Sequence, residues 1–100
     1  MKRETIVSLR IKELEKKHEK YDFARFLYLL RNAFRLTREV VSDETGISET
    51  RLFCLETGRY LKNFRTKEIA ILSAYYGINR VLLFDKAVKY FETDREQKTA

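Results

Sequence analysis

The chain has 100 residues, a length that suits a single domain. Hydrophobic residues make up 44% and charged residues 36%, which excludes a disordered tail. The apolar runs are far shorter than the ~20 residues of a membrane span, and the charged N-terminus lacks a signal core, so we expect a cytoplasmic protein without membrane contact. The net charge of +6 favours a polyanionic partner.

The N-terminal extension, residues 1–20, fits two patterns. Val7, Ile11 and Leu14 have the spacing of an amphipathic helix, whereas Val7, Leu9 and Ile11 alternate as in a short strand. The Glu- and Lys-rich residues that follow favour the helix, and we expect a helical extension.

Residues 22–35 show a clear helical period, and Asp22 is placed to cap the helix. Its apolar residues form one stripe: Phe23, Phe26, Leu27, Leu30 and Phe34. Three further helices are each predicted to begin at a hydroxyl cap and to end at a glycine, because proline is absent and glycine favours the left-handed end of a helix. These helices run from Thr37 to Gly46, from Ser48 to Gly58, and from Thr66 to Gly77.

The C-terminal segment opens at Asn79 and is predicted to run on as a helix through Ala87, Val88 and Phe91, with a break near Asp85 as the alternative. Residues 93–100 are predicted to be a frayed tail, which leaves residues 21–92 as the main domain. Leu83, Ala87 and Tyr90 are predicted to form an apolar face for a second copy of the chain, with the extra N-terminal helix as the other candidate interface.

The two short helices around Gly46 indicate a helix–turn–helix. Such a motif needs a small residue where the helices cross and a turn residue that tolerates positive φ, and Ser42 and Gly46 meet these needs. The second helix must be anchored to the core by apolar residues, which we assign to Ile47, Leu52 and Leu55.

Three segments carry a family resemblance: Leu36-Thr37-Arg38-Glu39, Gly46-Ile47-Ser48 and Leu55-Glu56-Thr57-Gly58-Arg59. With LSAYYGINRVLLF, they make residues 27–84 resemble the lambda-repressor-like (Cro/C1, XRE) DNA-binding domains. The resemblance implies an all-α bundle of about five helices containing the helix–turn–helix, here with an extra N-terminal helix and an extended C-terminal helix.

Three residues depart from the family pattern. Arg35 stands where a glycine usually precedes the Leu-Thr pair, Thr45 stands where an apolar residue is common, and Ser42 replaces an alanine. A left-handed conformation at Arg35 would cost of order 1 kcal/mol.

The side of the second motif helix that faces DNA follows from its leucines. Successive helical residues turn by about 100°, so inward Leu52 and Leu55 leave Thr50 and Cys54 pointing outward. The resemblance implies a larger set of base-reading positions: Arg38, Glu49, Thr50, Arg51 and Cys54.

Two of these positions have alternatives. Arg51 can donate two hydrogen bonds to guanine, or it can be a solvated surface arginine. Glu49 can accept from cytosine, or it can simply stabilise the N-terminus of its helix.

Phosphate binding is assigned to helix N-termini and to the basic loop after the second motif helix. The predicted phosphate-binding residues are Thr37, Ser48, Arg59, Lys62, Asn63 and Arg65. The resemblance also implies a structural ion pair between Arg31 and Glu56, partly buried, that holds the second motif helix in place.

These features predict a sequence-specific binder of double-stranded DNA that acts as a homodimeric transcriptional regulator, a repressor. The alternative is an antitoxin-type or other interaction module whose main partner is a protein, bound through the N- or C-terminal extension. No catalytic set, phosphate loop or metal-ligand spacing occurs in the sequence, and Cys54 is the lone cysteine, so we expect neither an enzyme nor a cofactor or metal site.

Overall fold

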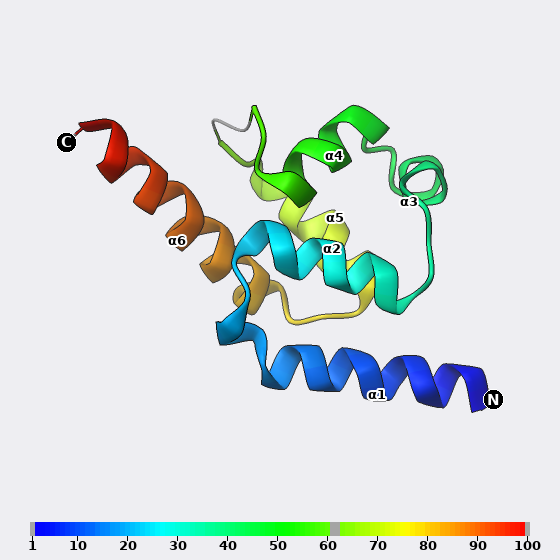
Figure 1. Ribbon diagram of the computed structural model, residues 1–100. Helices are drawn as coiled ribbons and strands as arrows, with labels where there is room; N and C mark the ends of the chain where they lie inside the picture. The colour runs from blue at the N-terminus through cyan, green and yellow to red at the C-terminus, as the bar shows by residue number, and fades with distance from the viewer. Residues whose placement is uncertain (1, 61–62, 100) are drawn as a thin grey trace.

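The computed structural model describes residues 2–60 and 63–99, with side chains for 9–60 and 63–91, and is helical throughout these ranges (Figure 1). No strand occurs among the described residues, so the all-α class is confirmed. In chain order the elements are α1 (Lys2–Lys16), the 3-10 helix η1 (His18–Lys20), α2 (Phe23–Ala33), α3 (Arg38–Thr45), α4 (Glu49–Thr57), α5 (Thr66–Tyr76) and α6 (Arg80–Thr99).

Helix α2 lies at the centre of the molecule, with α1 along one side and α4 and α5 on the other (Figure 1). It begins where the sequence predicted, because the Asp22 side chain accepts a hydrogen bond from the Arg25 N–H at 2.8 Å. Four residues of its apolar stripe are buried, and each such side chain contributes roughly 1.5–3 kcal/mol to folding: they are Phe23, Phe26, Leu27 and Leu30. Helix α4 packs on this stripe, so the stripe positions the candidate site.

One hydrophobic core joins all the α-helices. Its fully buried large side chains are Phe23, Phe26, Leu27, Leu30, Val41, Leu52, Leu55, Ile69, Leu72 and Leu83. Every one of the helices α2 to α6 contributes at least one of them, so the orientation of α4 is set by the same packing that stabilises the whole fold.

The N-terminal extension is a helix rather than a strand, and it packs on α2 through Ile11 and Leu14. Lys86 links the C-terminal helix α6 to the connection between α1 and α2 by hydrogen bonds. Its ammonium donates to the backbone carbonyls of His18 and Tyr21, and burial lowers the pKa of this lysine below its ordinary value.

Helix α6 runs without interruption from Arg80 to Thr99, as predicted for an extended C-terminal helix, so the alternative of a break near Asp85 is wrong. The helix also continues through the residues predicted to fray. Figure 1 shows its C-terminal part extending away from the other helices. The predicted interface on this helix also needs correction. Leu83 and Ala87 are completely buried in the protein's own core, because this stripe of α6 packs on α2 and α5.

Helix α5 begins at Thr66, which is its first residue and not its cap, contrary to the prediction. The cap position belongs to Arg65, whose N–H donates to the Glu68 carboxylate at 3.1 Å. A carboxylate three residues inside a helix satisfies the N–H of the cap residue itself, so this bond helps to place the start of α5 at Arg65.

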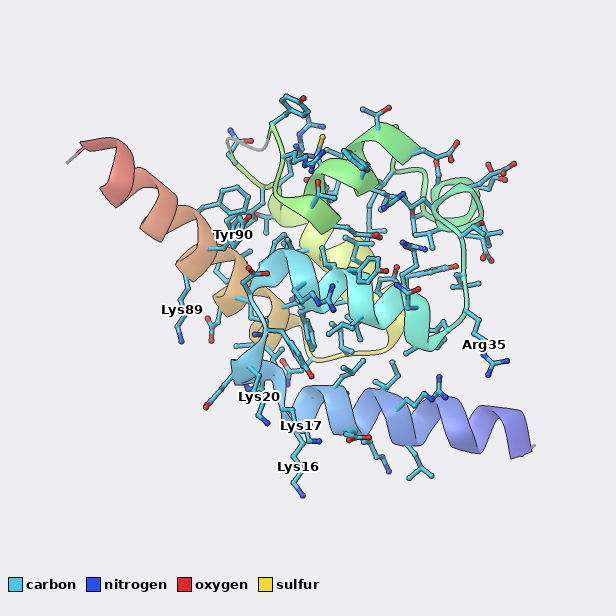
Figure 2. All side chains as sticks on the ribbon, viewed as in Figure 1. Lys16, Lys17, Lys20, Arg35, Lys89 and Tyr90 are labelled. Carbon is cyan, nitrogen blue, oxygen red and sulfur yellow. The ribbon has the colours of Figure 1, made fainter. Side chains whose placement is uncertain are left out.

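The turn between α2 and α3 holds Arg35 at φ +56°, in the left-handed region. The Arg35 N–H donates to the Asn32 carbonyl at 3.0 Å, and the Leu36 N–H donates to the Arg31 carbonyl at 3.2 Å. These two bonds form a Schellman motif, which normally has glycine at the left-handed position. Figure 2 shows the Arg35 side chain pointing away from the protein, so the strain is not offset by packing.

We expect Arg35→Gly to raise the free energy of unfolding by up to about 1 kcal/mol, because glycine adopts this φ without steric strain. Urea unfolding followed by circular dichroism measures the change. Arg35→Ala is the matched control, since it removes the same charge but keeps the Cβ atom and therefore the strain. Equal stability of the two variants would contradict a steric origin.

Candidate nucleic-acid interface

Helix α3 begins at a cap that fixes the direction of the chain after the Arg35 turn. The Thr37 hydroxyl accepts from the Val40 N–H at 3.2 Å, and Val41 is the residue that α3 buries in the core. Arg38, the first residue of α3, is half-buried, and its guanidinium lies over the Phe53 ring at 5.2 Å from the centroid. The first turn of α3 therefore rests against α4.

The turn between α3 and α4 uses the glycine in the way the sequence predicted. Gly46 has φ +81°, and its N–H donates to the Ser42 carbonyl at 2.9 Å. A Cβ atom at Gly46 would meet nothing within 4 Å, so the backbone conformation alone demands glycine here. Thr45 is held by hydrogen bonds: its hydroxyl donates to the Val41 carbonyl at 2.6 Å and accepts from the Ile47 N–H at 3.2 Å.

Helix α4 turns two leucines inward and a polar side outward. Ser48 caps the helix by accepting from the Arg51 N–H at 3.1 Å, and Leu52 and Leu55 are fully buried. Glu49 and Thr50 are exposed. Of the other predicted base-reading residues, Arg38, Arg51 and Cys54 are half-buried.

The C-terminal end of α4 lies close to Tyr90 of α6. Gly58 ends the helix at φ +74°, and a Cβ atom built there would lie 2.0 Å from the Tyr90 hydroxyl oxygen. Both the backbone angle and the close approach of Tyr90 therefore require glycine. Tyr90 therefore lies close to the end of α4 opposite the Gly46 turn.

A buried carboxylate holds α2, α3 and α4 together. Arg31 Nε donates to both carboxylate oxygens of Glu56, at 3.0 and 2.9 Å, and Arg38 Nε donates to the Glu56 Oε1 at 3.3 Å. The side chains of Arg31 and Glu56 are only 10% and 2% exposed. Arg31 Nη1 also donates to the Leu36 carbonyl at 2.8 Å, so one guanidinium joins the carboxylate to the α2–α3 turn.

Electrostatics support this geometry. Burial acts to lower the pKa of Arg31, but the hydrogen bond and the negative charge of Glu56 outweigh it and raise that pKa above its ordinary value. The guanidinium thus stays charged beside its partner. The structure brings together the two residues that the family resemblance implied as a pair.

Arg51 lies in a second ion pair that the sequence did not predict. Its Nε donates to Glu68 Oε2 at 2.6 Å, its Nη2 donates to Glu68 Oε1 at 2.8 Å, and Nη2 also donates to the Asn63 carbonyl at 3.1 Å. Glu68 is buried in the first turn of α5. Burial would raise the pKa of Glu68, but the hydrogen bonds from Arg51 and from the Arg65 N–H lower it below 4.5.

The residues predicted to bind phosphate lie at the starts of α3 and α4 and after α4. Thr37, Ser48, Arg59, Asn63 and Arg65 are all exposed, whereas Lys62 lies outside the described residues. The hydroxyls of Thr37 and Ser48 already serve as caps, so in this role they would offer the N–H groups of their helices rather than their own side chains. Tyr60, which the sequence did not single out, is 89% exposed in the same loop.

Lys16, Lys17 and Lys20 of the N-terminal extension form no part of this surface. Figure 2 shows Lys16, Lys17 and Lys20 around the end of α1, on the side of the molecule away from α3 and α4. Lys17 pairs with Glu13 at 2.9 Å. The candidate interface therefore consists of the outer side of α4, the start of α3 and the loop after α4.

Among the described residues, no group of three His, Cys, Asp or Glu side chains is placed to hold a metal ion. In the same part of the chain, no helix is both long and apolar enough to cross a membrane. Comparisons with protein-family models, with curated proteins and with solved structures gave no match to this chain.

We expect Arg31→Ala to lower the free energy of unfolding by about 3 kcal/mol, because it leaves the Glu56 carboxylate buried with only the longer contact to Arg38. Arg25→Ala is the matched control, since Arg25 is an exposed arginine of the same helix, and a surface substitution usually changes stability by less than about 0.5 kcal/mol. Urea unfolding measures both. Two variants of equal stability would mean that the pair contributes nothing.

Proposed function

We propose that this protein binds double-stranded DNA sequence-specifically, with α4 in the major groove, and acts as a transcriptional repressor. The observation that carries the proposal is the outer side of α4, where Glu49 and Thr50 are exposed while Leu52 and Leu55 hold the helix on the core. An α-helix fits the major groove, where each base pair presents a distinct pattern of donors and acceptors. The helix–turn–helix arrangement of α3 and α4 is part of this proposal, as is the resemblance to lambda-repressor-like domains.

Base reading in this proposal uses two kinds of side chain. Glu49 and Thr50 are exposed, and they offer an acceptor for cytosine N4 and a methyl group for thymine. Arg38, Arg51 and Cys54 are half-buried at the edges of the same surface. Arg38 and Arg51 each donate part of their guanidinium N–H groups to a buried glutamate, so only their other N–H groups can contact DNA.

Phosphate binding uses the ends of the helices and the loop after α4. The free N–H groups at the starts of α3 and α4 carry the positive end of the helix dipole, which favours an anion. Arg59, Asn63 and Arg65 are exposed in the loop between α4 and α5. Since each phosphate contact releases counterions, binding must weaken steeply as salt rises.

We further propose that the protein binds DNA as a homodimer through α6. Because Leu83 and Ala87 are buried, the candidate surface on α6 is the side that carries Val81, which is 66% exposed, and Phe84, which is partly exposed. These residues stand three apart and so share one side of α6. A different protein could take the same surface, which is the antitoxin-type alternative.

Selection from a random duplex pool tests the DNA-binding proposal. We expect enrichment of a near-palindromic site with half-sites about 10 base pairs apart, because paired modules place their recognition helices one helical turn apart. Glu49→Ala should relax the preference at one base pair of each half-site, a loss of about 1–3 kcal/mol in discrimination. Glu19→Ala is the matched control, because Glu19 is an exposed glutamate of η1, outside the predicted DNA-binding residues.

Three outcomes of this experiment would count against parts of the proposal. A folded protein that enriches no duplex, even at low salt, would refute DNA binding. Enrichment of single half-sites would refute the homodimer. An unchanged site preference in Glu49→Ala, with reduced helix stability, would assign Glu49 to the N-terminus of its own helix.

For the dimer surface we expect Val81→Glu to convert a dimer to a monomer in light scattering at micromolar concentration, since it places a charge in an apolar contact. Leu9→Glu is the matched control, because Leu9 is a similarly exposed apolar residue on α1, the other candidate interface. Loss of the dimer in Leu9→Glu alone would move the interface to α1. A wild-type monomer that remains monomeric with its selected DNA would refute the homodimer.

A further inference from the structure

The ion pair between Arg51 and Glu68 joins the candidate recognition helix to the helix behind it. Two parallel hydrogen bonds link the Nε–Nη2 edge of the guanidinium to the carboxylate, at 2.6 and 2.8 Å. The second hydrogen of Nη2 points to the Asn63 carbonyl, at 3.1 Å. Both hydrogens of Nη2 and the hydrogen of Nε are therefore used inside the protein.

Glu68 is held in place independently of Arg51. Its side chain is 8% exposed, and its Oε1 also accepts from the Arg65 N–H at 3.1 Å, the bond that starts α5. Its pKa is lowered, so the carboxylate is charged at neutral pH. A fixed, charged acceptor of this kind orients a guanidinium in one direction.

This arrangement limits what Arg51 offers to DNA. A bidentate contact to guanine needs two parallel N–H groups on neighbouring nitrogens, which an arginine supplies from its Nε–Nη2 edge or from its Nη1–Nη2 end. Both sets include Nη2, whose hydrogens are engaged by Glu68 and Asn63. Among the hydrogen bonds to described residues none uses Nη1, so this nitrogen is the part of the guanidinium left for a contact with DNA.

We propose that Glu68, a buried residue without access to DNA, is a specificity-determining residue that acts through Arg51. By holding the Nε–Nη2 edge, it restricts Arg51 to a contact through Nη1 alone, with one base acceptor or one phosphate oxygen, and so denies it the bidentate reading of guanine. This inference rests on the proposed DNA binding by α4.

Release of Arg51 is expected to change which sequences are preferred. Glu68→Gln keeps an acceptor for the Arg65 N–H but removes the charge that holds the guanidinium. Glu68→Asp keeps the charge but shortens the side chain by one methylene, which withdraws the carboxylate from Arg51. Both variants free the Nε–Nη2 edge, and they do so with different effects on net charge.

The experiment compares wild type, Glu68→Gln and Glu68→Asp on the selected duplex and on duplexes with each base at each position of the half-site. In both variants we expect a new preference for guanine at one position, roughly fivefold to a hundredfold. Glu19→Gln, which removes one exposed negative charge from η1, is the matched control and should strengthen binding to all duplexes alike. Thermal melting verifies that each variant is folded.

Substitution of Arg51 separates a specific effect from a change in charge. In an Arg51→Ala or Arg51→Lys background, Glu68→Gln should produce no guanine preference, since neither side chain can donate two parallel hydrogen bonds. A guanine preference that persists without the arginine would overturn the proposal. So would folded Glu68 variants whose base preferences match those of wild type.

The measurements distinguish a failure of the proposed DNA binding from a failure of the proposed role of Glu68. If the folded wild-type chain binds no duplex, the proposed function is wrong and the role of Glu68 is refuted with it. If wild type binds a selected site while the Glu68 variants show its base preferences, only the role of Glu68 is refuted.

Discussion

The fold around the candidate site depends on one buried carboxylate, that of Glu56. It lies at the point where α2, α3 and α4 meet, and it accepts from Arg31 on one side and from Arg38 on the other. Because Arg31 also donates to the Leu36 carbonyl, the same network determines where the chain leaves α2 and where α3 begins. Removing charges from water costs free energy, so such a network contributes more to fixing one arrangement of the helices than to the net stability of the fold.

A second buried glutamate, Glu68, joins two elements in the same way at the other end of the site. Glu68 receives Arg51 from α4 and the Arg65 N–H from its own helix, so it fixes both the start of α5 and the position of an α4 side chain. Arg38 and Arg51, the two arginines predicted to read bases, are thus each paired with a buried glutamate. The side chains left unrestrained on the outer side of α4 are the small or acidic ones, Glu49 and Thr50.

The ends of α4 show how local and distant constraints combine. Before its start, only the backbone angle requires glycine at position 46, since the space around Gly46 is open. At its end, both the backbone angle of Gly58 and the close approach of Tyr90 favour glycine, although Tyr90 of α6 is more than thirty residues away in sequence. Tyr90 of α6 therefore lies close to the end of α4, and the inward stripe of α6 packs in the core.

The sequence by itself determined the features that depend on neighbouring residues: the caps at Asp22, Thr37 and Ser48, the glycine ends, and the inward leucines of α4. The Arg31–Glu56 pair spans 25 residues and followed from a family resemblance, not from any spacing. Tertiary structure alone decided which stripe of α6 is buried and that Arg51 is held by Glu68. Helical periodicity places residues on a common side, but the partner of that side is chosen by helices distant in sequence, whose packing no local pattern encodes.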